Sequence, residues 1–276
     1  MNHDQTYPAT FDAGFLDWFR ERTESAWAAL PDMTSQEILA VYVENGAGGS
    51  EFQRGSRWLG GMSEEQIAQI ERTQRLTFPP DYHLFLRQLH TLDRPMLTAG
   101  YLAFEERLED QQGILASAYV DEAEQYMVLE EYSGGFHNWL TDSPDTAIQP
   151  AALWEGLQFD IEYNNLWLAD WGSKPTSIEG CKERVRELVE AAPKLLRVIG
   201  HRYLLAEPAI PGNPVFSIVQ SDMVVYGPNL HDFLLFEFAD TLGLTRRNIE
   251  REVMREARAR QDEYAVIPFW GSFFKR

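Results

Sequence analysis

The stretch VFSIVQSDMVVYG, residues 215–227, gives the clearest indication of fold class in this chain. It contains two runs rich in β-branched and aromatic residues, which favour strands. Ser221 and Asp222 separate the two runs, and both residue types are common in tight turns. The stretch LLRVIGHRYLLA, residues 195–206, has the same composition and is predicted to be one strand. This part of the chain is therefore expected to contain three strands, the last two joined by a tight turn.

A second group of strands is predicted earlier in the chain. The runs GILASAYV (113–120) and QYMVLEE (125–131) are short and rich in strand-forming residues. The polar residues DEAE (121–124) lie between them. This spacing predicts an antiparallel hairpin with a loose turn.

Helices are predicted on both sides of these strands. Tyr82, Phe85, Leu86 and Leu89 follow one another at the spacing of an amphipathic helix. Four helices are predicted over residues 10–30, 35–42, 176–192 and 245–260. Three more are predicted from their first residues: one begins after Ser63, one has Pro80 in its first turn, and one is capped by Asn229. The predicted capping residues are Thr10, Ser63 with Gln66, Thr176 with Glu179, and Asn229. The aromatic tail YAVIPFWGSFFKR, residues 264–276, is expected to pack onto the rest of the chain, since exposed it would favour aggregation.

The composition limits the classes of partner. The chain has 276 residues, 44% of them hydrophobic, a formal net charge of −19 and a sequence pI near 4.7. A chain this acidic repels nucleic acid and anionic lipid, so neither is expected as a partner. It attracts a basic protein partner. The alternative explanation is that the charge serves solubility alone.

The cysteine content and the N-terminus indicate a compartment. Cys181 is the sole cysteine, which excludes an internal disulfide and a multi-cysteine zinc site. The first residues, MNHDQTYPATFD, lack the pattern of a signal peptide, and no run approaches the ~20 apolar residues of a membrane span. We therefore expect a reducing cytoplasm, with no metal and no cofactor.

No strong catalytic motif occurs in the chain. HExxH, GxSxG, Walker A and paired CxxC motifs are absent, and the six histidines are scattered. Cys181 near a helix start could act as a nucleophile with His201 as its base, but a small structural thiol is favoured. Alternation in FDIEY places Asp160 and Glu162 on the solvent face of a strand, which favours an ordinary surface over an acid–base pair. The chain is accordingly predicted not to be an enzyme.

The loop NNLWLADWGSKP, residues 164–175, combines two tryptophans with turn-forming residues. Trp167 and Trp171 are expected to close the core where one element turns into the next, with Asp170 contributing to the turn. The alternative is that Trp167, Asp170 and Trp171 line a ligand groove.

Five stretches, in their order along the chain, resemble the SUKH superfamily. That superfamily includes fungal regulators of cell-wall synthesis and many bacterial toxin-immunity proteins. The stretches are FPPDYHLFLRQL, LWEGLQFDIEYNNLWLADWGSKP, APKLLRVIGHRYLLAEP, GNPVFSIVQSDMVVYGPNL and IPFWGSFF. The resemblance covers residues 63–276 and leaves residues 1–62 as an N-terminal helical extension. In the first stretch, the Asn-Gly turn common in the family is missing. The resemblance implies an α+β fold, with a central, mostly antiparallel sheet flanked by helices, and no catalysis.

These observations together predict a non-enzymatic binding protein. The resemblance and the acidic charge favour an immunity protein that neutralises a basic toxin. The acidic residues Asp121, Glu122 and Glu124 in the predicted hairpin turn are the candidate contacts for that partner. A scaffold or regulatory domain that binds a cellular protein is the first alternative, and a carboxylate-dependent hydrolase is the second.

Overall fold

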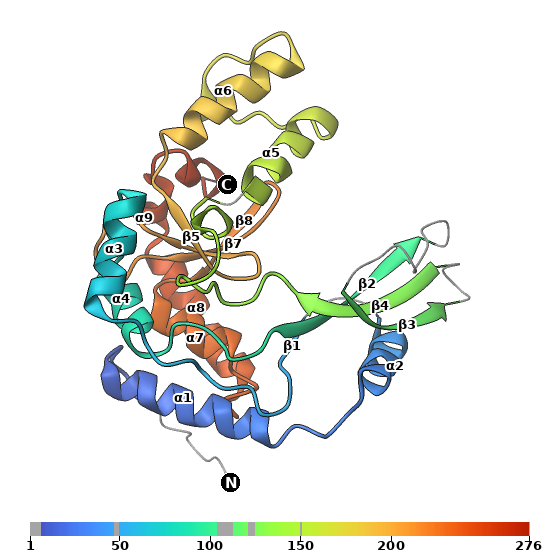
Figure 1. Cartoon of the computed structure of the whole chain (residues 1–276). Helices are drawn as coiled ribbons and strands as arrows, with labels where there is room; N and C mark the ends of the chain where they lie inside the picture. The colour runs from blue at the N-terminus through green and yellow to red at the C-terminus, as the bar shows by residue number, and fades with distance from the viewer. Residues whose placement is uncertain (1–6, 47–49, 104–112, 121–124, 150, 276) are drawn as a thin grey trace. The chain divides into compact units, whose positions relative to one another are not determined.

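A computed structural model describes residues 7–46, 50–103, 113–120, 125–149 and 151–275. The fold belongs to the α+β class, with helices flanking antiparallel sheets, as predicted (Figure 1). The strands are divided between two sheets, and the chain forms two compact units. Unit 1 comprises residues 1–20, 60–91 and 136–276, and unit 2 comprises residues 21–59 and 92–135. These boundaries differ from the predicted boundary between residues 62 and 63, because each unit is built from segments that are distant in the sequence.

The sheet of unit 1 is antiparallel with the strand order β5-β6-β7-β8. Its strands are β5 (Leu195–Ile199), β6 (Arg202–Leu205), β7 (Val215–Val219) and β8 (Asp222–Gly227). A tight turn joins β7 and β8 as predicted, but it lies one residue earlier than Ser221 and Asp222. Val219 pairs with Asp222, so Gln220 and Ser221 form the turn, and Gln220 adopts a φ of +55°. The prediction of one strand over residues 195–206 is wrong. Gly200 adopts a φ of +55°, which reverses the chain and makes β5 and β6 a hairpin.

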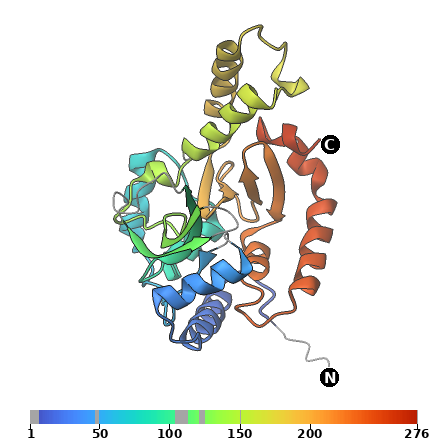
Figure 2. The same ribbon diagram turned by 90° about the vertical axis from the view of Figure 1, so that its right-hand side faces the viewer.

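Helices surround this sheet within unit 1. They are α3 (Glu64–Gln74), α4 (Pro80–Gln88), α5 (Ala151–Tyr163), α6 (Ile178–Glu190), α7 (Leu230–Glu237), α8 (Arg246–Ala259) and α9 (Gln261–Ala265), and α1 (Ala13–Ala28) contributes its first half. Short 3-10 helices lie at η2 (Pro144–Thr146), η3 (Ala169–Trp171) and η4 (Trp270–Phe273). Figure 2 shows α8 running along the β8 side of the sheet. The helix α5 lies beside α6 (Figure 1).

The residues that cap the helices were predicted correctly for two helices and incorrectly for two others. Ser63 and Gln66 form the predicted capping box at α3, and Asn229 caps α7. The predicted Thr176 cap is wrong by one residue, because Ser177 accepts the hydrogen bond from the Gly180 amide and no capping box forms. The predicted Thr10 cap is also wrong. The Asp12 side chain instead accepts a hydrogen bond from the amide of Phe15 at the start of α1.

The segment around FDIEY is a helix, so the strand prediction there is wrong. Leu153, Leu157 and Ile161 are buried at a four-residue spacing on α5, which outweighs the short alternation in FDIEY. Asp160 is consequently buried, with 3% of its surface exposed, and it accepts hydrogen bonds from the Ser221 amide and the Asn164 side chain. Glu162 is exposed and pairs with Lys182.

The aromatic tail packs into the core of unit 1, as predicted. Trp270, Phe273 and Phe274 belong to one buried cluster with residues of α5, α6 and the sheet. The Trp270 indole donates a hydrogen bond to the carbonyl of Pro193, 2.7 Å away, which anchors the tail against the end of α6. The tail therefore contributes apolar burial to the fold.

Unit 2 is a second antiparallel sheet covered by a helix. Its strands are β1 (Ser50–Glu51), β2 (Met96–Ala103), β3 (Ile114–Val120) and β4 (Gln125–Tyr132), in the order β1-β2-β4-β3, and its helix is α2 (Ser35–Asn45). The predicted hairpin of residues 113–131 is confirmed as β3 paired with β4. Leu39 and Tyr42 of α2 pack on Leu97, Met127 and Leu129 of the sheet.

Candidate functional site

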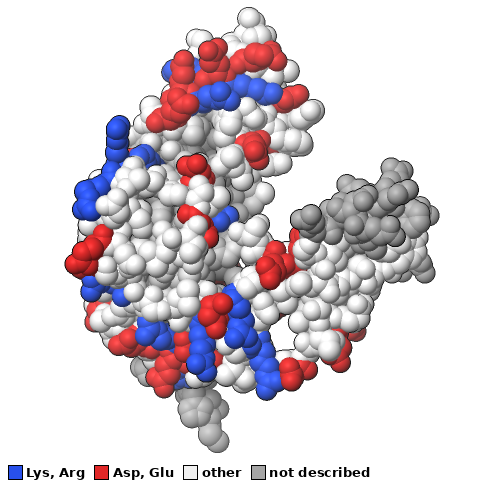
Figure 3. Space-filling view, viewed as in Figure 1, with Lys and Arg blue, Asp and Glu red and all other residues white. Residues whose placement is uncertain are grey.

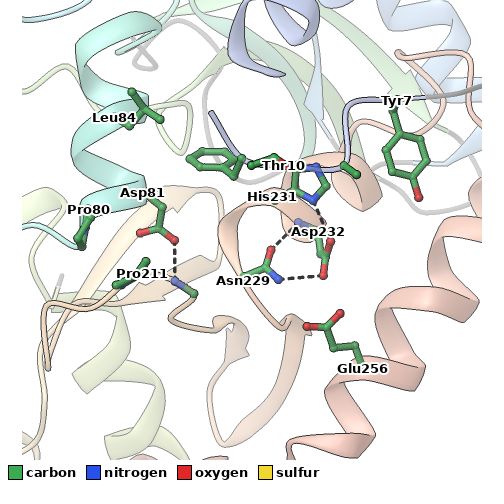
Figure 4. Close-up of a pocket in the computed structure, with 13 residues that line it drawn as sticks. Tyr7, Thr10, Pro80, Asp81, Leu84, Pro211, Asn229, His231, Asp232 and Glu256 are labelled. Atoms are coloured by element: carbon green, nitrogen blue, oxygen red, sulfur yellow. Dashed lines mark hydrogen bonds and ion pairs between the residues drawn. The ribbon is translucent and has the colours of Figure 1, made fainter. Parts of the chain in front are cut away.

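Unit 1 contains a pocket of about 760 Å³ whose polar lining is acidic (Figure 4). It is formed by the start of α4, the loop between β6 and β7, the start of α7, one side of α8 and the segment before α1. We call it the acidic pocket. Its lining residues are Tyr7, Ala9, Thr10, Phe11, Pro80, Asp81, Leu84, Pro211, Gly212, Asn229, His231, Asp232 and Glu256.

Asp81 lies in the first turn of α4 because Pro80 opens that helix. Its carboxylate accepts hydrogen bonds from the amide of Tyr82 at 3.0 Å and the amide of Gly212 at 3.2 Å. Gly212 has a φ of +80°, a conformation that a residue with a side chain rarely adopts, so the loop can present its amide to Asp81. Burial raises the pKa of Asp81, although the amides of Gly212 and Tyr82 oppose that rise.

Asp232 is held at the start of α7 by the residue that caps this helix. The Asn229 side chain accepts a hydrogen bond from the amide of Asp232 at 2.9 Å and donates one to the Asp232 carboxylate at 3.0 Å. This reciprocal pair fixes the Asp232 side chain at the helix N-terminus, where the helix dipole favours a negative charge. Figure 4 shows both side chains at the edge of the pocket.

His231 lies between Asp232 and the chain segment before α1. Its Nε2 atom is 2.9 Å from the carbonyl oxygen of Pro8, and its Nδ1 atom is 3.0 Å from a carboxylate oxygen of Asp232. A carbonyl oxygen can only accept, so the Nε2 atom carries the hydrogen that points at Pro8. His231 therefore links the start of α7 to the segment before α1.

Glu256 projects from α8 toward the same pocket (Figure 4). Partial burial and the nearby Asp232 raise the pKa of Glu256, while Arg260 and Arg255 lower it by less. Arg260 donates hydrogen bonds to the carbonyls of Gly212 and Pro228 and pairs with Glu263, so its charge is directed to these groups. None of the described residues that line the pocket is a lysine or an arginine. The carboxyl groups of Asp81, Asp232 and Glu256 therefore give the pocket its acidic character.

Aromatic side chains form part of the pocket wall. The Tyr7 hydroxyl donates a hydrogen bond to Glu252, 3.0 Å away. Partial burial and this hydrogen bond raise the pKa of Tyr7 to about 12, so the hydroxyl stays protonated at neutral pH. The Phe11 ring lies 6.3 Å from His231. Aromatic faces beside carboxylates suit an organic cation, which interacts favourably with both.

The loop predicted as a possible ligand groove is part of the core. Trp171 is 2% exposed and packs on Trp167 and Phe269, at ring distances of 5.5 and 5.7 Å. Trp167 is half-buried and donates a hydrogen bond to the carbonyl of Gly172. These contacts agree with the expectation that the two tryptophans close the core.

Asp170 is paired within the chain. Its carboxylate lies 2.5 Å from the Lys275 ammonium and accepts a hydrogen bond from Ser272, so it ties η3 to the C-terminal tail. The hydrogen bond and charge of Lys275 lower the pKa of Asp170. The other three predicted contacts, Asp121, Glu122 and Glu124, lie outside the described residues. The three described ones, Trp167, Asp170 and Trp171, are not among the residues that line the acidic pocket.

Cys181 has the environment of a structural residue, and His201 lies exposed in the turn between β5 and β6. Cys181 is 3% exposed within the core of unit 1, and its thiol donates to the carbonyl of Pro175 at 3.5 Å. Partial burial and the positive charge of Arg202 lower the pKa of His201. Within the described parts of the chain, no group of three His, Cys, Asp or Glu side chains could hold a metal ion. No helix among the described residues is long and apolar enough to span a bilayer.

Sequence reasoning missed the residues that form the acidic pocket. The available signal was the pair of helix starts: Pro80 followed by Asp81, and Asn229 followed three residues later by Asp232. Both patterns place a carboxylate in a first helical turn, but only the fold brings the two turns and Glu256 to one pocket.

The fold and the pocket define an α+β protein with an acidic, aromatic-walled pocket. No protein-family model, curated protein or solved structure matches the chain.

Proposed function

We propose that this chain is a non-enzymatic binding protein that recognises a basic protein through the acidic pocket. The observation that carries the proposal is the lining of the pocket, whose described residues include three carboxylates and neither lysine nor arginine. The formal net charge of −19 acts in the same direction, since it speeds the approach of a basic partner.

The raised pKa values of Asp81 and Glu256 support a cation as the bound group. A carboxyl pKa rises when burial is not compensated by a nearby positive charge. A lysine or arginine side chain that entered the pocket would supply this charge and would favour the ionised carboxylates. Tyr7 and Phe11 would at the same time offer ring faces to the cation.

On the face that Figure 3 shows, the charge of the surface outside the pocket is mixed. Acidic and basic side chains are interspersed over α6, so this helix does not present a uniformly negative surface. Exposed ion pairs such as Arg184 with Glu187 contribute to that pattern. The acidic pocket is therefore a better candidate for specific recognition than α6.

The resemblance to the SUKH superfamily makes a toxin the favoured basic partner, with this chain as its cytoplasmic immunity protein. Toxins that act on nucleic acid must approach phosphates, so they are often basic. A scaffold or regulatory role toward a cellular protein would use the same pocket chemistry. The two roles differ in the identity of the partner and in whether binding protects the cell.

The experiment is affinity capture from the source cells with the full chain immobilised in three forms. These are the wild type, Glu256→Lys in the pocket, and Glu155→Lys on the exposed side of α5 as a control with the same change of charge. A basic protein should be retained by the wild type and by the control and lost from Glu256→Lys. Retention on all three forms, or equal loss from both variants, would contradict the role of the pocket. Co-expression with the captured protein then tests protection of growth, which only the immunity role predicts.

A carboxylate-dependent hydrolase is a second candidate because of one observation. Partial burial and the neighbouring Asp232 raise the pKa of Glu256, as in acid–base carboxyl pairs. A substrate panel tests this candidate. Turnover that is abolished in Glu256→Gln and retained in Glu155→Gln would favour an enzyme over a binding protein.

A further inference from the structure

Unit 2 contains a pocket of its own, with a volume of about 610 Å³. This size falls within the ~300–1,000 Å³ of typical small-molecule sites. The pocket lies between α2, the turn that precedes α2, the residues that follow β1, and the start of β2. We call it the apolar pocket. Its lining residues are Leu30, Pro31, Asp32, Met33, Ile38, Val41, Tyr42, Asn45, Gly46, Glu51, Phe52, Gln53, Arg54 and Leu97.

Aliphatic and aromatic side chains contribute about half of the surface that lines this pocket, and its two opposite charges at Asp32 and Arg54 pair with each other. Asp32 and Arg54 form an ion pair at 3.1 Å, and their side chains are 90% and 50% exposed. Their charges therefore compensate each other in solvent. Glu51 remains as a negative charge, which disfavours an anionic ligand. The aliphatic and aromatic wall disfavours any ion that would have to shed its water to enter.

Tyr42 provides an unused hydrogen-bonding group at this pocket. It is 7% exposed, and its hydroxyl is closed to water without a hydrogen-bond partner among the described residues. A buried hydroxyl without a partner is unfavourable, so such groups in native structures require an explanation. Burial and the nearby Glu51 raise the pKa of Tyr42 to about 12, so the hydroxyl keeps its proton. It can both donate and accept a hydrogen bond.

We propose that the apolar pocket binds a small, uncharged, mostly apolar organic molecule whose single polar group pairs with the Tyr42 hydroxyl. The apolar wall supplies most of the binding free energy, and the hydroxyl orients the ligand. Because the hydroxyl is closed to water in this structure, binding includes a side-chain shift that opens it to the ligand. The site is independent of the acidic pocket and of the function proposed for that pocket.

The test uses N-phenyl-1-naphthylamine, an uncharged aromatic probe with one N–H group whose fluorescence rises in apolar surroundings. The wild-type chain should bind it saturably, at one site. Val41→Trp should weaken binding at least about tenfold, since the indole fills the pocket, and a tenfold change corresponds to about 1.4 kcal/mol. Val43→Trp is the matched control: Val41 and Val43 are 46% and 39% exposed on the same helix, and only Val41 lines the pocket. Circular dichroism and melting curves check that both variants fold.

Tyr42→Phe tests the hydroxyl alone. Loss of one hydrogen bond should weaken probe binding about fivefold. Tyr101→Phe is its control, because Tyr101 is 51% exposed and does not line the pocket. The absence of saturable binding, or equal weakening by both tryptophan variants, would overturn the site. Unchanged affinity in Tyr42→Phe would overturn the role of the hydroxyl.

Discussion

The loop of residues 164–175 and the acidic pocket use similar side chains in opposite ways. In the loop, Trp171 is buried in the core and Asp170 is paired with Lys275. In the pocket, the aromatic rings line an open space, and the carboxyls of Asp81 and Glu256 have raised pKa values because burial is not fully compensated. Aromatic and acidic residues therefore indicate a binding site where the fold lines a cavity with them and the described lining holds no lysine or arginine to pair with the carboxylates.

The largest expected effect lies in the loop. Trp171→Ala should lower the free energy of unfolding by on the order of 3–5 kcal/mol, because a fully buried indole is replaced by a cavity. Urea denaturation of the purified variant measures this loss. Trp167→Ala should cost clearly less, since Trp167 is only half-buried. A Trp171→Ala midpoint near that of the wild type would mean that the loop is open and would break the comparison.

A second prediction concerns two buried histidines of unit 1, His90 and His137. Burial lowers the pKa of His90 and of His137 from 6.5 to about 4. Between these values the unfolded chain binds more protons than the folded chain, so stability is lost as pH falls from about 6.5 to about 4. Each site contributes a slope of up to about 1.36 kcal/mol per pH unit in that window.

Denaturant midpoints between pH 7 and pH 4 measure this slope. His137→Phe keeps a ring in place and removes the titrating group, so the dependence on pH should become shallower. His83→Phe is the control, because His83 is partly exposed beside Glu64. An identical slope in the wild type and in His137→Phe would show that His137 does not titrate differently in the folded chain.

The smallest expected effect is the difference in stability between neutralising a carboxylate in the pocket and neutralising one in the loop. Glu256→Gln should raise stability at pH 7 by less than about 1 kcal/mol, because it removes a charge that partial burial and Asp232 disfavour, and solvent screens much of that cost. Asp170→Asn should not raise stability, since it removes a charge that Lys275 favours. Thermal melts at pH 7 compare the two variants. A decrease in stability for Glu256→Gln would mean that its charge is compensated in the folded chain.

The sequence was informative where local rules determine structure. The Ser63–Gln66 capping box, the Asn229 cap, the hairpin of β3 and β4 and the packing of the aromatic tail were predicted from short patterns and are confirmed. Predictions from short patterns were wrong where the spacing of buried residues over a longer segment, or one backbone angle, determined the secondary structure. The alternation in FDIEY predicted a strand, but the buried Leu153, Leu157 and Ile161 have the spacing of a helix, and the segment is helical. The turn at Gly200 divides one predicted strand into two.

The candidate site was less predictable than the fold. Its lining comes from five chain segments between residues 7 and 256, and no local pattern reveals that they meet. The charge of the chain did favour a basic partner, which remains a proposal. The individual residues could not be identified, because Asp81, Asp232 and Glu256 resemble other acidic residues until their surroundings are known.

The central claim is that the acidic pocket recognises a cationic group, and binding of an octa-arginine peptide tests it most directly. Fluorescence anisotropy would compare the wild type, the pocket variant Asp81→Asn/Glu256→Gln, and the control variant Asp145→Asn/Glu155→Gln, which changes two exposed acids by the same charge. At about 0.1 M salt, where the Debye length is about 10 Å, the pocket variant should bind at least about tenfold more weakly than the wild type. The control should stay within about twofold of the wild type, since exposed charges at a distance are screened. Equal weakening in both variants would assign the binding to overall charge and would contradict recognition by the acidic pocket.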